Sequence, residues 1–155
     1  MRTLLAIIAT LAVSSTASEA LARPYVDGTV SLGIGLGDPT ALDAKFWTGN
    51  GSGLDIGLGL EHFDDIFGIY AEYEFGLAAF RLGDNGGRGV FYVGIGGAVA
   101  FKDNDHTSVA LIIPIGLDFR LASPIDIFIE ARPGAGLVHR PAFGIGGQIG
   151  IRFRL

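Results

Sequence analysis

A histidine and a serine stand two positions apart, at His106 and Ser108. Residues two apart on a strand share one face, so the imidazole could activate the hydroxyl as a nucleophile if an acidic side chain oriented it. That arrangement would suit the hydrolysis of an ester. The pair lies in or beside the charged segment Lys102–Thr107, however. We therefore interpret it as part of a solvated loop and assign no catalytic residue.

Carboxylates and cations recur at alternate positions through much of the chain. The carboxylates could perform acid–base chemistry or bind cations, but none stands at a recognisable catalytic spacing with a nucleophile. We expect them to pair with the cations in a barrel-interior charge network, because an unpaired buried charge is costly. The predicted network consists of Asp43, Lys45, Asp55, Glu72, Glu74, Asp118, Arg120, Asp126, Glu130, Arg132, Arg152 and Arg154, and Glu61 is placed on the same face.

Two further features could indicate a cofactor. The glycine clusters at 33–37, 94–97 and 144–147 do not spell G-x-G-x-x-G at the start of a helix, as a dinucleotide site would. His62 and His139 are single histidines in predicted loops, without the partners that a metal site requires. We therefore predict no cofactor and no metal, and interpret the glycines as small residues on the inner face of strands.

The elements that must position these residues are β-strands. From Phe143 to Leu155 the odd positions are apolar apart from Gly147, and the even positions are glycine, glutamine or arginine. Strand side chains alternate between two faces, so this segment has one apolar face and one small or charged face. The same pattern predicts eight strands, at Val26–Leu36, Ala41–Thr48, Gly53–Glu61, Phe67–Leu82, Val90–Phe101, Ser108–Leu121, Ile125–Val138 and Phe143–Leu155. A change of phase near Ala78 and Ala79 predicts a β-bulge or the end of a strand there.

Residues 1–22 have the pattern of a cleaved signal peptide: Arg2, the apolar run Leu4–Val13 and the small-x-small site Ala20–Ala22. Residues 23–155 then form one domain. The chain has no cysteine, so it has neither a disulfide framework nor a site for lipid attachment to cysteine. After the signal, the best apolar run is about nine residues, too short for a membrane helix of ~20 residues. The net charge of −5 argues against a nucleic-acid partner.

A mean hydropathy of +0.46, divided into alternating segments of about ten residues, is typical of transmembrane strands. An Arg or Lys facing lipid at mid-depth would cost about 2–4 kcal/mol, so the charged face must point inward. Phe91 and Phe101 bracket one apolar face, and Phe143 and Phe153 bracket another. Ten residues of a tilted strand climb roughly 26 Å, close to the ~25 Å apolar band of an outer-membrane barrel. We therefore predict an all-β fold, an eight-stranded antiparallel up-and-down transmembrane β-barrel with periplasmic termini.

The signal segment, the eight amphipathic strands and the absence of cysteine together resemble the small eight-stranded outer-membrane β-barrels of Gram-negative bacteria. The nearest comparisons are the transmembrane domain of OmpA and the OmpX type. The segment Gly35–Trp47 (GLGDPTALDAKFW) also resembles the first hairpin of an outer-membrane barrel family. The alternation at the end of the chain resembles the signal read by the barrel-insertion machinery, although Leu155 replaces the usual aromatic residue. His106 and Ser108 resemble the His-x-Ser pair of lipid A deacylases, but the residues after Ser108 depart from that family's pattern.

The resemblance implies a monomeric protein of the cell outer membrane, with outer-membrane lipid and the barrel-insertion machinery as partners. An eight-stranded barrel is just wide enough to be filled by side chains, so we expect no open pore. The expected role is structural or surface interaction, without enzymatic activity, and an acidic patch at Asp64, Asp65, Asp103 and Asp105 could meet a surface partner or cation. Two alternatives stay open: a small outer-membrane lipid hydrolase, and a soluble periplasmic ligand-binding barrel with its apolar face inward.

Overall fold

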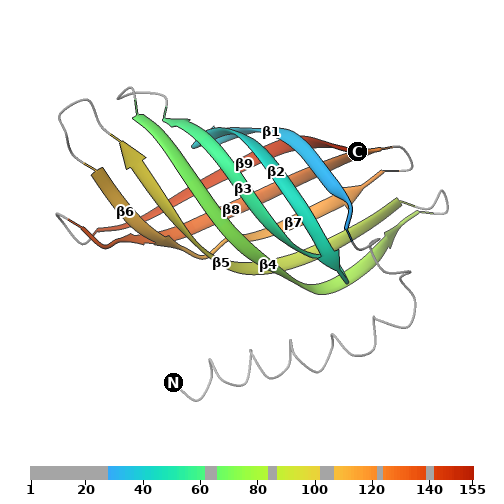
Figure 1. The fold of residues 1–155 in the computed structure, drawn as a ribbon. Coiled ribbons are helices and arrows are strands. Elements are labelled where there is room, and N and C mark those ends of the chain that lie inside the picture. The colour runs from blue at the N-terminus through green and yellow to red at the C-terminus, as the bar shows by residue number, and fades with distance from the viewer. Residues whose placement is uncertain (1–27, 62–65, 84–86, 102–106, 122–123, 139–141) are drawn as a thin grey trace, which may run out of the picture.

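The computed structural model describes residues 28–61, 66–83, 87–101, 107–121, 124–138 and 142–155. The regular elements of this part are β1 (Val30–Asp38), β2 (Thr40–Gly49), β3 (Ser52–Glu61), β4 (Ile66–Leu82), β5 (Gly87–Phe101), β6 (Thr107–Ile112), β7 (Ile115–Arg120), β8 (Ile125–Gly136) and β9 (Phe143–Arg154). Neighbouring strands pair antiparallel, and the β4–β5 and β1–β9 pairings close the sheet into a ring (Figure 1). The all-β, antiparallel part of the prediction is confirmed.

The described residues form nine strands where the sequence predicts eight, because the predicted strand Ser108–Leu121 is divided into β6 and β7. Pro114 stands at the break and has no N–H to donate to a ladder. Both pieces pair with β5 on one side and with β8 on the other. The hydrogen bonds continue across the break, from Ile113 N to Pro133 O (2.9 Å) and from Gly94 N to Pro114 O (2.8 Å). The two pieces therefore occupy one place in the ring.

The other strand boundaries differ from the predicted ones by a few residues. The pairing of β4 with β5 shifts register between Gly76 and Ala78, which confirms the predicted bulge one or two residues earlier than expected. β5 begins at Gly87 instead of Val90, because Gly87 already pairs with Leu82. The start of the first predicted strand, at residues 26 and 27, and the predicted signal peptide, residues 1–22, lie outside the described residues.

The two ends of the ring are formed by different strand ends and turns. At the first, which we call the C-terminal end, lie the last residues of β9, the end of β4 and the start of β5 (Figure 1). The opposite end, the mouth end, holds the tight turn between β1 and β2 and the ends of β3, β5 and β8 (Figure 1). In sequence, these three strands lead into residues 62–65, 102–106 and 139–141, which lie outside the described residues.

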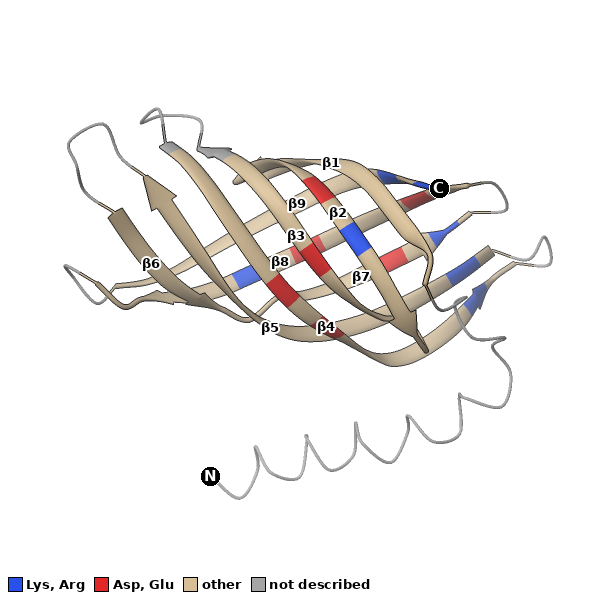
Figure 2. Cartoon of the chain, viewed as in Figure 1, with Lys and Arg blue, Asp and Glu red and all other residues tan. Residues whose placement is uncertain are grey.

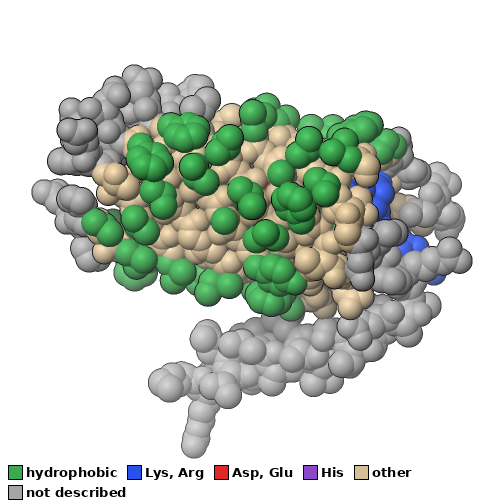
Figure 3. All heavy atoms as spheres, viewed as in Figure 1, with side chains coloured by type: hydrophobic (Ala, Val, Ile, Leu, Met, Phe, Trp, Pro, Cys, Tyr) green, Lys and Arg blue, Asp and Glu red, His purple; other side chains and the backbone are tan. Residues whose placement is uncertain are grey.

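The polarity of the ring is the reverse of that in a water-soluble protein. Within the described residues, 29 large apolar side chains are exposed, and only seven hydrophobic residues are buried. Twelve polar or charged residues are buried instead. Apolar side chains are spread over the visible outer wall (Figure 3). The period-two alternation therefore places charge on the inner face and aliphatic side chains on the outer face.

Glycines on the inner face allow aromatic rings to lie against a neighbouring strand. Tyr70 stands beside Gly57 in the β3–β4 ladder, and Phe128 stands beside Gly150 in the β8–β9 ladder. A Cβ at either glycine would collide with the ring next to it. Tyr92 and Gly116 repeat the arrangement between β5 and β7. Such aromatic–glycine pairs fix register in curved sheets, and here they hold three rings flat on the inner wall.

Candidate functional site

The buried charges come from the inner faces of β2, β3, β4, β7, β8 and β9 (Figure 2). Of the twelve residues in the predicted network, ten are buried: Asp43, Lys45, Asp55, Glu72, Glu74, Asp118, Asp126, Glu130, Arg132 and Arg152. The other two, Arg120 and Arg154, are partly exposed near the C-terminal end. Three cations, Lys45, Arg132 and Arg152, organise the buried acids around them.

Arg152 on β9 is the centre of the largest group of charges. Its Nε donates to Asp43 Oδ1 and its Nη1 donates to Asp118 Oδ1, each at 3.0 Å. Its Nη2 donates to Asp55 Oδ2. The Cζ atom lies 3.8 Å from the centre of the Phe128 ring, within the range of a cation–π contact. Arg152 therefore joins β2, β3 and β7 across the interior of the ring.

Lys45 on β2 extends the same group. Its Nζ pairs with Glu74 of β4, and it also lies 2.5 Å from Asp118 Oδ2, so Asp118 bridges Lys45 and Arg152. The Nζ atom lies 4.1 Å from the ring centre of Trp47 and 4.7 Å from that of Tyr92. A desolvated ammonium gains from two aromatic faces as well as from two carboxylates.

Arg132 on β8 forms a second group nearer the mouth end. Its Nη2 donates to Glu72 Oε1 at 2.8 Å, and its Nε pairs with Glu130. Its Cζ lies 3.9 Å from the centre of the Tyr70 ring. Tyr92 Oη donates to Glu130 Oε2 at 2.7 Å, which links this group to the aromatic contacts of Lys45.

Each of the three buried cations therefore has the same surroundings. An inner-wall glycine supports an aromatic ring, the ring faces the cation, and two or three carboxylates complete the contacts. For Arg152 the stack is Gly150, Phe128 and the guanidinium. The aromatic rings are a part of the network that the sequence analysis does not predict. The odd–even alternation already places Tyr70, Tyr92 and Phe128 on the same face as the charged residues, but the glycine opposite each ring is known only from the strand register.

At the C-terminal end the charges are less enclosed. Arg154 Nε lies 3.2 Å from Asp126 Oδ1, and the Arg154 side chain is 17% exposed. Asp126 stands between Arg120 and Arg152 in the β7–β8 and β8–β9 ladders. Water can reach this pair from the end of the ring, so its geometry is less constrained than that of the enclosed groups.

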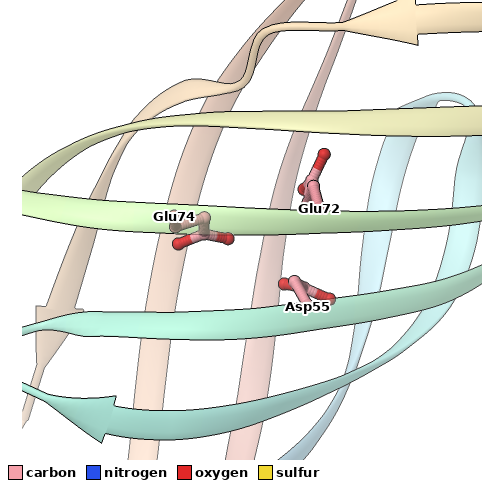
Figure 4. A group of neighbouring side chains, drawn as sticks. All are labelled: Asp55, Glu72 and Glu74. Carbon is pink, nitrogen blue, oxygen red and sulfur yellow. The ribbon is translucent and has the colours of Figure 1, made fainter.

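The enclosed part of the network has more acids than bases. Six carboxylates, those of Asp43, Asp55, Glu72, Glu74, Asp118 and Glu130, surround the three cations. Asp55, Glu72 and Glu74 lie close together (Figure 4), and one oxygen from each lies within 4.8 Å of the other two. Each of the three is already paired with a base. The arrangement suits a fixed charge network, and within the described residues the acids form their ion pairs with Lys45, Arg132 and Arg152.

Most of the other candidate residues named from the sequence lie outside the described residues. Ser108 is exposed on β6, and His106 lies outside the described residues, as do His62, His139 and the acidic patch at Asp64, Asp65, Asp103 and Asp105. Gln148 and Ser31 are buried polar residues that the sequence analysis does not single out. Gln148 Nε2 donates to Pro39 O at 2.6 Å, and Trp47 Nε1 donates to Ser31 Oγ at 3.0 Å.

Comparison with family models, curated proteins and solved structures gives no match for this chain. Among the described residues, no helix has the length and apolar character needed to cross a membrane. The site must therefore be interpreted from its own chemistry and from the fold that holds it.

Proposed function

We propose that residues 23–155 form an eight-stranded transmembrane β-barrel in which β6 and β7 count as one strand. It lies in the outer membrane of a Gram-negative bacterium, after removal of residues 1–22 as a signal peptide. The observation that supports this proposal best is the reversed polarity of the ring. Soluble monomers rarely expose apolar patches larger than a few hundred Å². Here Ile113 and Ile149 are typical of an apolar surface that extends over the strands, while Arg152 and Lys45 are fully enclosed. A hydrocarbon environment accounts for both observations.

The positions of aromatic residues agree with this proposal. Phe67 and Phe101 stack near the mouth end with ring centres 6.5 Å apart. Phe80 and Phe119 meet near the other end with ring centres 6.3 Å apart. Aromatic residues are expected at both interfaces of a membrane-spanning barrel. The soluble calyx requires the apolar face to point inward, and the observed alternation favours the membrane proposal over it.

We further propose that the barrel has a structural or surface-interaction role, as a monomer without an open pore and without catalysis. Trp47, Tyr92 and Phe128 fill the interior together with Lys45 and Arg152, all under 2% exposed. An interior filled in this way leaves no room for a continuous column of water. Its partners would be outer-membrane lipid, the barrel-insertion machinery through β9, and a surface partner at the mouth end.

Membrane extraction tests the location. We expect the full chain, expressed in a Gram-negative host, to remain with outer membranes during washes in sodium carbonate and in urea. A soluble periplasmic protein in the same cells, which should be released, is the control. Release of the chain into either wash would refute membrane insertion.

Planar-bilayer recording tests the absence of a pore. We expect refolded protein to give no stable channel, and a porin reconstituted in parallel should conduct. Large, long-lived openings would contradict the filled interior and favour a transport function.

A further inference from the structure

Three arginines stand side by side on neighbouring strands at the C-terminal end of the ring. Arg81 of β4 lies directly opposite Arg88 of β5, and Arg88 lies directly opposite Arg120 of β7. We call these three residues the arginine row. Neighbouring strands are about 4.7–4.9 Å apart, so the row is roughly 10 Å long. Figure 2 shows basic residues at this end of β4, β5 and β7.

The arginine row belongs to the inner face of the strands. Val90, two positions after Arg88, is buried inside the ring. Ala79, two positions before Arg81, packs against the same buried cluster. Side chains two apart on a strand share a face, so both arginines are on the inner face. Residues directly opposite in a ladder also share a face, which places Arg120 with them.

The row also lies at the rim of the wall, where the strands end. β4 ends one residue after Arg81, β5 begins one residue before Arg88, and β7 ends at Arg120. Arg81 is exposed, and the other two arginines are half-buried. Lys45 and Arg152 of the charge network are fully enclosed instead. A solute at this end of the ring can therefore reach the row but not the network.

Positive charge is concentrated at this rim. Within the described residues, Asp126 is the one acid that stands opposite a member of the row in a ladder, and it also contacts Arg154 Nε at 3.2 Å. Asp84 lies between the first two arginines in sequence, outside the described residues. Like charges directly opposite each other destabilise a strand pair. Two successive arginine–arginine pairs therefore favour the binding of an anion beside them.

Guanidinium chemistry restricts the class of anion. Each guanidinium has a planar fork of N–H donors that matches the oxygens of a carboxylate or a phosphate. A single carboxylate has only two oxygens to share among the arginines. A phosphate group has three or more acceptor oxygens and carries more charge, so several forks can donate to it together. The row therefore suits a phosphate group better than a carboxylate.

The outer wall beside the row indicates one source of phosphate. Phe80 and Phe119 are the sequence neighbours of Arg81 and Arg120, and their rings meet with centres 6.3 Å apart. Aromatic side chains of a membrane barrel lie at the interface with water. Lipid headgroups occupy the same level. In the barrel proposed above, the row is therefore at the depth of lipid phosphates.

We propose that the arginine row binds a phosphate group at the C-terminal end of the ring. Arg81, Arg88 and Arg120 donate hydrogen bonds to its oxygens together. The phosphate belongs to a lipid headgroup or to a soluble molecule, since both present the same oxygens. The row itself does not depend on the membrane location proposed above, and only the lipid source of the phosphate does.

Titrations followed by nuclear magnetic resonance of the arginine Nε–H signals test this site. The full chain is purified from an expression host in a non-ionic, phosphate-free detergent and kept at constant ionic strength. The probes are inorganic phosphate and phosphatidic acid, with acetate and diacylglycerol as their phosphate-free controls. We expect saturable shifts with a phosphate probe, and binding of acetate weaker by about tenfold or more.

The two phosphate probes distinguish the sources. Saturation at a lower concentration of phosphatidic acid than of inorganic phosphate supports a lipid headgroup, and the reverse order supports a soluble phosphate. No saturable shift with either phosphate probe, equal binding of acetate, or an equal response to diacylglycerol would overturn the proposal.

Substitutions locate the binding. Arg88→Gln removes the central member of the row and should weaken phosphate binding by about tenfold or more, and Arg88→Lys, which keeps the charge without the fork, by severalfold. Arg154→Gln is the matched control, because it removes the same charge at the same end but outside the row, and it should change the affinity by less than about twofold. Equal weakening by Arg88→Gln and Arg154→Gln would refute the row as a site.

Two further variants complete the test. If Arg88→Gln does not fold, as judged by heat-dependent mobility in detergent gels, Arg81→Gln replaces it, because the Arg81 side chain is exposed. Asp84→Asn removes the acid that lies between these arginines in sequence, so it should leave phosphate binding unchanged or stronger. Loss of binding in Asp84→Asn would contradict recognition of an anion.

This proposal and the membrane location can fail separately, because the titrations in detergent need no bilayer. A chain that resists carbonate extraction but binds neither phosphate probe refutes the arginine row alone. A chain that binds inorganic phosphate but is washed from membranes refutes the membrane location alone.

Discussion

The interior of the ring consists of two regions built on the same strands. β4 and β8 pass through both: Tyr70 and Gly134 line a cavity of about 360 Å³ near the mouth end, the mouth cavity, while Glu74 and Asp126 belong to the charge network. In the network, large charged and aromatic side chains meet in the interior and are almost fully buried. In the mouth cavity, alanines and glycines cover the wall and a void remains.

The difference teaches that a closed sheet of this size does not by itself decide whether its interior is filled. The size of the inner-face residues at each level of the ring decides whether that level is filled. The charge network also contains most of the contacts that cross the interior, so it should contribute more to stability than the cavity region. The following substitutions test that asymmetry, from the largest expected effect to the smallest.

Arg152→Met should have the largest effect. It keeps much of the side-chain volume but leaves Asp43, Asp55 and Asp118 without their shared cation. Breaking a buried ion pair by removing one partner costs about 3–5 kcal/mol. Urea unfolding of protein refolded into vesicles measures this cost. A loss under about 1 kcal/mol would mean that the network does not hold the ring together.

Ile149→Arg tests the outer wall, which surrounds both regions. Ile149 is exposed on β9 and pairs with Ile129 and Leu36. If the outer wall faces lipid, as we propose, an arginine near mid-depth should cost about 2–4 kcal/mol in the same unfolding assay. Ile149→Leu is the control and should be nearly silent, because lipid makes little demand on side-chain shape. The reverse order of effects would place Ile149 in a packed interior.

Gly150→Val compares the two regions on a single strand. A side chain at Gly150 would collide with the Phe128 ring, which supports Arg152, so we expect a loss of about 1–3 kcal/mol. The matched change Gly144→Val lies six residues earlier on the same face of β9, where no atom lies within 4 Å of a Cβ. It should change stability by less than about 0.5 kcal/mol. Equal losses at the two glycines would remove the distinction between the regions.

Arg154→Gln should have the smallest effect. Arg154 contacts Asp126 at the C-terminal end, where water can replace the lost interaction. Partly exposed pairs contribute about 1 kcal/mol or less. The loss should also shrink at high salt, whereas that of Arg152→Met should hardly change. Equal losses for the two variants would show that enclosure does not strengthen the network.

Much of the fold can be predicted from the sequence because period-two alternation is a local property. The inner-face positions of Asp43 and Lys45, and the outward position of Ile149, follow from odd and even numbering alone. The bulge after Gly76 follows from a local change of phase. The division of the sixth predicted strand at Pro114 also has a local cause, the proline itself. It was not predicted because the residues on both sides of the proline continue the apolar alternation of a single strand.

The partners within the network could not be predicted in the same way. Lys45 stands beside Asp55 in the β2–β3 ladder, yet it pairs with Glu74 and Asp118. These contacts cross the interior, so they depend on the tilt and closure of the sheet and not on sequence spacing. The mouth cavity escaped prediction for a related reason. Its alanines and glycines were recognised as small, but only the closed ring shows that no large side chain extends over them.

The seam between β1 and β9 also dictates an order of events during biogenesis. Ser31 pairs with Arg154, and Leu155 N donates to Val30 O at 2.9 Å, so the first and last strands meet over more than a hundred residues. The ring cannot close until β9 has been synthesised. Until then both strands present open edges that could pair with other chains. Until β9 is made, the nascent chain can therefore pair with its own copies through the open edges of β1 and of the strands already formed.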